Sequence, residues 1–213
     1  MLLLAKIHRA EYVTDMYNKE YLYFNSLKGF RANPRDKSGR LDPRELNMKN
    51  RQLTRLTIKI PKGKEFHIHE STKFSAQYME HLSVPKINCC SLHWIDIEID
   101  EQPKSHNNRL IELGDKTLLI YEWKQFFDKL DEAIEERGFQ YSRRKVEYYN
   151  PKQFDGDLTL HHKDIAFSWQ NEYRILIAPT DNEPIKISIP GLKKISKVVD
   201  TKDMATLRIK IDN

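Results

Sequence analysis

A short stretch in the last third of the chain carries polar side chains at every second position. Residues 170–177 read QNEYRILI, so that three polar groups lead directly into an apolar run. On a strand, Gln170, Glu172 and Arg174 would share one face. A carboxylate held by a strand can stabilise positive charge that develops in a transition state. An amide such as that of Gln170 can only orient a partner through its donor and acceptor.

A simpler interpretation of the same stretch needs no chemistry. Tyr173, Ile175 and Ile177 would take the opposite, apolar face of the strand. Glu172 would then only neutralise Arg174, as an ion pair on an edge strand. Both interpretations remain open from these residues alone.

The histidines do not have the spacing of a metal site. His67 and His69 are two apart on a predicted strand, His161 and His162 are adjacent, and His93 stands by itself. A zinc site needs three or four converging ligands. The sequence therefore predicts no metal site, and it contains no glycine-rich phosphate loop or nucleophile elbow.

The cysteines and one acidic cluster are weak candidates for chemistry. Cys89 and Cys90 are adjacent, which disfavours a disulfide and predicts two reduced strand residues. Asp96, Glu98 and Asp100 alternate along one strand and could hold Mg²⁺ in a nuclease. This is the weakest of the functional hypotheses that we consider.

The elements that must position these residues are mostly strands. Residues 123–137 have apolar side chains at helical spacing, Trp123 among them, and Gly138 follows as a stop. A shorter helix fits residues 8–17. Many strands without regular strand–helix alternation favour an α+β fold with a mixed or antiparallel sheet, in one domain spanning residues 1–213. Strands are predicted at residues 20–27, 55–60, 64–69, 87–99, 114–122, 143–149, 173–177, 185–189, 196–200 and 206–211, and residues 1–5 begin a strand or lead into a helix.

The positive charge of the chain is concentrated in one segment. Lys28–Lys59 has ten Lys or Arg residues and three acidic ones, a surplus of seven, so the rest sums to −2 of the net charge of +5. Most of it belongs to a long loop predicted at residues 29–50. Such a segment indicates a nucleic acid, a phosphate-bearing ligand or an acidic protein as partner, or else a solvated loop.

Composition places the chain among ordinary soluble proteins. Charged residues make up 31% and hydrophobic residues 39% of the 213 residues. No apolar run is long enough to span a membrane. The apolar start, residues 1–5, is too short for a signal peptide. We therefore expect a cytoplasmic protein, whose oligomeric state the sequence does not indicate.

Three segments, in order, resemble a known family. Residues 9–31, with the Asp, Gly, Arg and Glu residues that follow at 36–45, are similar to the N-terminal pattern of a large uncharacterised bacterial and phage family. Residues 114–130 and 161–177 resemble its later blocks, a strand-to-helix unit and a strand with a Lys-Asp…Glu-x-Arg pattern. The Gln-x-Glu at the head of that strand looks like the third motif of ADP-ribosyltransferases. This family resembles ADP-ribosyltransferases of the DarT-like and mRNA-directed toxin types. The resemblance covers residues 8–50 and 113–178.

The resemblance implies an ADP-ribosyltransferase-like fold with a split sheet and implies NAD as the substrate. Glu172 would be the catalytic carboxylate, which faces the oxocarbenium-like ribose when the nicotinamide bond breaks. Gln170 would meet the acceptor, and since it cannot take a proton from a guanidinium, a nucleobase or amide acceptor is favoured over arginine. Cofactor-binding residues implied by the resemblance are Tyr23, Asn25, Ser26, Arg31 and Arg40.

One departure from the family pattern weakens this assignment. In the related enzymes the N-terminal strand carries a polar anchor for NAD, often Arg or His, and the matching position here is Asn25. An asparagine cannot pair with a phosphate as a guanidinium does. We therefore expect NAD-dependent ADP-ribosylation of a nucleic acid or protein, in a conflict between phage and bacterium. The alternative is a non-catalytic protein of the same fold that binds a nucleotide, a nucleic acid or a host-defence protein.

Overall fold

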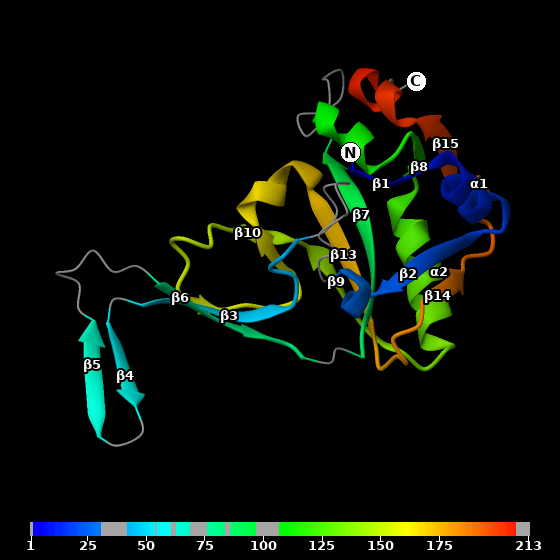
Figure 1. The fold of residues 1–213 in the computed structure, drawn as a ribbon. Helices are drawn as coiled ribbons and strands as arrows, with labels where there is room; N and C mark the ends of the chain where they lie inside the picture. The colour runs from blue at the N-terminus through cyan, green and yellow to red at the C-terminus, as the bar shows by residue number, and fades with distance from the viewer. Residues whose placement is uncertain are drawn as a thin grey trace.

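The main sheet forms the centre of the molecule. The computed structural model describes residues 2–30, 42–53, 55–60, 63–68, 76–83, 86–96 and 107–207. Eight of the described strands make one sheet in the order β14-β2-β7-β1-β8-β15, with β13 and β9 added on the other edge of β7, and their pairs are antiparallel (Figure 1). These strands are β1 (Leu2–His8), β2 (Tyr21–Ser26), β7 (Asn88–Asp96), β8 (Lys116–Ile120), β9 (Gln140–Lys145), β13 (Glu172–Ala178), β14 (Ile185–Ser188) and β15 (Ser196–Asp200).

The sheet divides along one edge of β7. Strand β1 pairs with β7 from Asp96 down to His93, whereas β2 pairs with the same edge only at Cys89 and Asn88. Residues 90–92 of β7 therefore face a fork between β1 and β2. On the opposite edge β7 is paired without interruption with β13. At the fork, side chains from β1, β2, β7 and β13 can approach one another.

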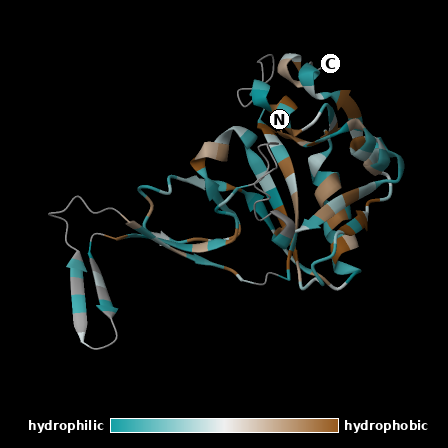
Figure 2. Ribbon diagram, in the orientation of Figure 1, coloured by the Kyte–Doolittle hydropathy of each residue, from teal (hydrophilic) through white to brown (hydrophobic). Residues whose placement is uncertain are grey.

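The largest apolar cluster lies between the sheet and two helices. α1 (Ala10–Asn18) contributes Val13 and Met16, and α2 (Trp123–Glu135) contributes its buried apolar stripe. On β13, Tyr173, Ile175 and Ile177 point into this cluster, so the other face of the strand is left for polar groups. Figure 2 shows the hydrophobic residues gathered in the main sheet and α2. The stripe of α2 consists of Phe126, Phe127, Leu130 and Ile134.

Smaller sheets extend from the main one. β3 (Asn47–Leu53), β6 (Ala76–His81) and β11 (Gly156–Asp157) form a three-stranded sheet, and Figure 1 shows the hairpin of β4 (Leu56–Ile60) and β5 (Lys64–Ile68) beyond it. β10 (Glu147–Tyr149) and β12 (His162–Asp164) pair in parallel beside the head of β13. Short 3₁₀ helices are η1 (Leu27–Phe30), η3 (Asn108–Leu113), η4 (Ile165–Gln170), η5 (Leu192–Lys194) and η6 (Thr201–Thr206).

The architecture confirms the predicted α+β class, with mostly antiparallel strands and few helices. The hairpin at residues 55–69 and the helix that begins at Trp123 are confirmed. Neither of the two α-helices in the described ranges has the length and apolar character of a membrane span.

Two predictions about local structure were wrong, and a third is tested only at its first residues. The loop predicted at residues 29–50 ends earlier, because β3 begins at Asn47. This strand has no alternating apolar pattern in its sequence, and it forms by pairing with β6 and β11. Residues 143–149 do not form one strand, since the strand is interrupted at Val146, between β9 and β10. The strand predicted at residues 206–211 begins in η6 and otherwise lies outside the described residues.

Two aromatic residues of the helices lie outside the fully buried core. Tyr12 of α1 is 49% exposed. Trp123 is only half-buried and packs edge-on against Phe127. We therefore expect Phe126→Ala to lower the free energy of unfolding by about 3–5 kcal/mol and Trp123→Ala by clearly less. Urea unfolding of the two variants measures the difference, and an equal loss would show that Trp123 is a full member of the core.

Candidate functional site

The head of β13 holds Glu172 in a central position rather than at a sheet edge. β13 lies between β7 and β9, so the edge strand assumed in the simpler interpretation was wrong. The chain enters from η4 through Asn171, whose φ of 39° is left-handed and ends the helix. Tyr148 accepts the Glu172 N–H at 2.8 Å through its hydroxyl oxygen. The backbone of Glu172 is thereby fixed from the side of β10.

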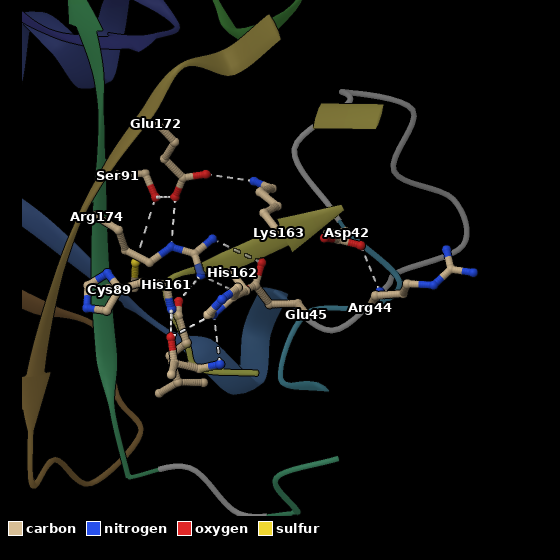
Figure 3. Close-up of polar contacts among 12 residues, drawn as sticks. Asp42, Arg44, Glu45, Cys89, Ser91, His161, His162, Lys163, Glu172 and Arg174 are labelled. Atoms are coloured by element: carbon tan, nitrogen blue, oxygen red, sulfur yellow. Dashed lines mark hydrogen bonds and ion pairs between the residues drawn. The ribbon is translucent and has the colours of Figure 1, made fainter. Parts of the chain in front are cut away.

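Three donors hold the Glu172 carboxylate (Figure 3). Its Oε1 accepts hydrogen bonds from the Ser91 hydroxyl at 2.5 Å and from Arg174 Nε at 2.9 Å. Its Oε2 accepts from Lys163 Nζ at 2.8 Å. The side chains of Glu172, Lys163 and Arg174 are only 4%, 4% and 2% exposed. The Glu172–Arg174 ion pair was predicted, but it is buried and belongs to a larger cluster.

A second carboxylate completes the cluster from the far side of Arg174. Both oxygens of Glu45 accept from the Arg174 guanidinium, at 2.7 and 3.3 Å. Arg174 also donates to the Leu160 carbonyl. Glu45 is buried, and it lies in the turn between the end of the undescribed residues 31–41 and β3. One guanidinium therefore joins two carboxylates that are far apart in the sequence.

The two carboxylates have opposite pKa shifts. Burial alone would raise the pKa of Glu172, but Arg174 and Lys163 outweigh it and hold that pKa well below its usual value. For Glu45, loss of hydration outweighs the attraction of Arg174 and Lys163, so its pKa is raised. The lowered pKa favours the anionic form of Glu172 near neutral pH.

A cavity of about 630 Å³ lies at the fork of the sheet. This volume is within the range of small-molecule sites. Lys6 stands in the fork, where its Nζ donates to the Ser91 carbonyl at 2.9 Å. Within the described part of the chain, Lys6 has no carboxylate at ion-pair distance. Polar and aromatic side chains of the lining include Lys6, His8, Tyr12, Tyr23, Asn25, Glu45, Ser91, His93, Lys163, Gln170, Glu172 and Arg174.

Most of the sequence-predicted site residues that the structure describes line this cavity. Tyr23 and Asn25 reach it from β2, and Gln170 and Glu172 from the opposite edge of β7. Gln170 does so from η4, not from a strand, so its predicted position on β13 was wrong. Ser26 is buried beside the cavity and donates from its hydroxyl to Asn182 Oδ1 at 3.4 Å. Arg31 and Arg40, the predicted pyrophosphate anchors, lie outside the described residues.

Several cavity residues were missed by the sequence analysis. Lys6 and His8 of β1 line the cavity and stand two positions apart, one on each side of Ile7. Polar residues at alternate positions after the apolar residues 2–5 were the signal in the sequence that could have identified them. Lys163 and Glu45 lie within the segments that carried the family resemblance. Nothing in the sequence indicated that Ser91 would face Glu172, because that contact depends on the pairing of β7 with β13.

The basic segment is largely compensated where it is described. Four of its cations have carboxylate partners: Arg44 pairs with Asp164 at 3.0 Å, Lys49 with Glu80 at 3.3 Å, Arg51 with Asp155 and Asp157, and Lys59 with Glu65 at 3.1 Å. The surplus of charge in Lys28–Lys59 is therefore reduced by acids from the rest of the chain.

The proposed magnesium cluster is not assembled in the described residues. Asp96 pairs with Lys145 at 3.3 Å and accepts from Trp94 Nε1, while Glu98 and Asp100 fall in the undescribed range 97–106. Among the described residues, no group of three or more His, Cys, Asp or Glu side chains could hold a metal ion.

His161 lies beneath the cluster and makes stability depend on pH. It is buried, and its Nε2 shares a hydrogen bond with the Ser142 hydroxyl at 2.9 Å. Burial, together with Arg144 and Arg174, lowers its pKa from 6.5 to about 4. The unfolded chain therefore binds this proton at a higher pH than the folded protein does. The free energy of unfolding should fall by about 3 kcal/mol as pH drops from about 6.5 to about 4.

Chemical unfolding of His161→Gln between pH 4 and pH 7 tests this expectation. The variant should lose less stability on acidification than the wild type, because glutamine does not titrate. His67→Gln, at an exposed histidine of β5, serves as the control and should follow the wild type. Parallel curves for His161→Gln and the wild type would show that His161 does not cause the acid sensitivity.

No protein-family model, curated protein or solved structure matches the chain. The cavity itself offers three features: a carboxylate at the head of a central strand, a lysine in the fork of the sheet that has no carboxylate partner among the described residues, and two partly exposed tyrosines in the lining.

Proposed function

We propose that the chain transfers ADP-ribose from NAD to a macromolecule and has an ADP-ribosyltransferase-like fold. The observation that carries this proposal is the position of Glu172. Its carboxylate is anionic, fixed by three donors, and lines the same cavity as Tyr23 and Asn25 of β2. The resemblance implies a carboxylate at the head of a strand that shares a cavity with residues of the N-terminal strand, and Glu172 matches this arrangement.

The residues of the cavity fit a dinucleotide. Its volume of about 630 Å³ suits a ligand of that class. Tyr12 and Tyr23 are 49% and 38% exposed and offer aromatic faces for the nicotinamide or adenine ring. Lys6 offers an ammonium group for the pyrophosphate. Lys6 lies on β1, and it would hold the phosphates of NAD, which Asn25 cannot do.

NAD, when bound, would supply an ADP-ribosyl group whose bond to nicotinamide leaves positive charge on the ribose as it breaks. Glu172 would face that charge and stabilise it electrostatically. Ser91, Arg174 and Lys163 keep the carboxylate in one orientation, so it does not need to reorganise during the reaction. Gln170, held by Lys163 at 2.7 Å, would orient the acceptor. The acceptor would be a nucleic acid or a protein, in a conflict between phage and bacterium.

A second candidate function is binding without turnover. It is favoured by the same hydrogen bonds, since both oxygens of Glu172 are already engaged by protein donors. A carboxylate in that state has little capacity for a ribose hydroxyl. The cavity would then retain a nucleotide, or display a bound nucleotide to a partner, without breaking the nicotinamide bond.

The two candidates are separated by three measurements on the wild-type protein. Calorimetry measures NAD binding, chromatography measures nicotinamide release, and transfer of label from NAD labelled at the adenylate phosphate is measured with RNA, with single-stranded DNA and with a bacterial protein extract. The transferase should give all three signals with one acceptor class. Binding without release or transfer would favour the second candidate. Absence of NAD binding would overturn both nucleotide assignments.

A further inference from the structure

The proposed transfer requires a group that takes a proton from the acceptor. Gln170 cannot do so, because an amide does not accept a proton near neutral pH. Glu172 is a poor base, since Arg174 and Lys163 hold its pKa far below neutrality. Glu45 has both oxygens on Arg174. We propose that His93 is the catalytic base that deprotonates the acceptor, an inference that rests on the proposed function.

His93 stands directly beside Glu172 in the sheet. The two residues are register partners on β7 and β13, so their side chains lie on the same face as close neighbours. On its other side His93 is paired with Ala5 of β1, and both residues line the cavity. His93 is 5% exposed and lines the cavity. It is thus placed between the catalytic carboxylate and the fork.

The backbone fixes which ring nitrogen can act as a base. Nδ1 of His93 lies 2.6 Å from the carbonyl oxygen of Gln170. A carbonyl oxygen only accepts hydrogen bonds, so Nδ1 must carry the proton. In the neutral ring the lone pair is therefore on Nε2, as in other histidines that a hydrogen bond at Nδ1 orients for proton transfer. The carbonyl that fixes this tautomer belongs to Gln170, the residue that would orient the acceptor.

The chemical step balances without another reactant. The bond between the ribose C1′ and nicotinamide breaks, and its electron pair leaves with nicotinamide. The acceptor nitrogen or oxygen forms the new bond to C1′, and its proton passes to His93 Nε2. The resulting imidazolium lies beside the Glu172 carboxylate, which stabilises its charge, and the proton then leaves to solvent. The acceptor is thereby restricted to a neutral N–H or O–H group, such as an amide, a hydroxyl or a nucleobase.

The variant His93→Asn separates a base from a structural residue. The asparagine Nδ2 can replace the Nδ1–H donor to the Gln170 carbonyl, but asparagine cannot take a proton. With the acceptor identified by the transfer assay, the variant should lower the transfer rate by at least about a hundredfold. Nicotinamide release to water in the absence of acceptor should change by no more than about threefold, because a proton from water passes to bulk solvent. Imidazole added to His93→Ala should restore part of the transfer.

Each outcome of this experiment has a distinct meaning. If transfer and hydrolysis fall together in His93→Asn, the histidine has a structural role and the inference is overturned. Unchanged transfer overturns it as well. A wild-type protein that shows neither transfer nor nicotinamide release removes the proposed function, and the inference with it. Nitrogen-15 NMR of the histidine rings adds a readout without turnover: neutral His93 should be protonated at Nδ1, and a proton on Nε2 would contradict the assignment.

Discussion

Replacing Glu172 with glutamine is expected to reduce NAD-dependent labelling of the acceptor by at least about a hundredfold. Glutamine has nearly the same shape but no charge, so the positive charge that develops on the ribose would lose its stabilising partner. The hydrolysis of NAD in the absence of acceptor should fall with it, unlike in His93→Asn. The initial rate of label transfer, measured at saturating NAD, gives the comparison.

This substitution also leaves Arg174 and Lys163 without one of their carboxylates, so Glu172→Gln should be less stable than the wild type. A control of comparable instability is therefore needed. Leu130→Ala removes a fully buried side chain from α2, outside the cavity lining, at a cost of about 2–5 kcal/mol. Below its melting temperature it should keep its activity. Full activity of Glu172→Gln would remove the catalytic assignment.

Replacing Arg174 with methionine is expected to lower the free energy of unfolding by about 3–5 kcal/mol. The variant leaves two buried carboxylates, Glu172 and Glu45, without the cation that joins them. Glu172 keeps Lys163, but Glu45 loses its ion-pair partner, so burial should raise the pKa of Glu45 further above that of an unfolded carboxylate. A folded state that binds protons more readily gains stability as pH falls, so the deficit of the variant should shrink on acidification. Urea titrations at pH 5 and pH 8 measure it.

Arg143→Met is the matched control for this experiment. Arg143 also lies on a strand of the main sheet and pairs with a carboxylate, that of Asp131 at 2.6 Å, but its side chain is 28% exposed. A partly exposed pair contributes little, so its loss should cost about 1 kcal/mol or less. If Arg174→Met unfolds at the same urea concentration as Arg143→Met, the buried cluster contributes no special stability.

Local patterns in the sequence predicted the elements that carry the site. The alternation in residues 173–177 predicted both the strand and its two faces. Successive side chains of a strand point to opposite faces, so a strand with one apolar and one polar face shows apolar residues at every second position. The amphipathic pattern after Trp123 predicted α2 for the same kind of reason. Tyr23, Asn25 and Glu172 were assigned to one site, and they line one cavity.

The parts that were not predicted depend on contacts between distant segments. No local pattern indicates that Glu45 meets Arg174, which follows it by 129 residues. β3 has no apolar alternation and exists as a strand because β6 and β11 pair with it. The turn at Asn171 places Gln170 in a 3₁₀ helix, although a continuous strand pattern had been expected there. Sequence periodicity records which face is buried, but not which neighbour covers it.

The insertion of β13 between β7 and β9 has a consequence for a chain that is still being synthesised. A ribosome would synthesise β1, β2, β7 and β9 before it adds Glu172 and Arg174, so β7 and β9 have to wait for the strand that joins them. Non-local pairings of this kind form late in folding. A product truncated before residue 172 would lack the carboxylate to which we assign the proposed transfer. Under that proposal, transfer would begin only after β13 has entered the sheet between β7 and β9.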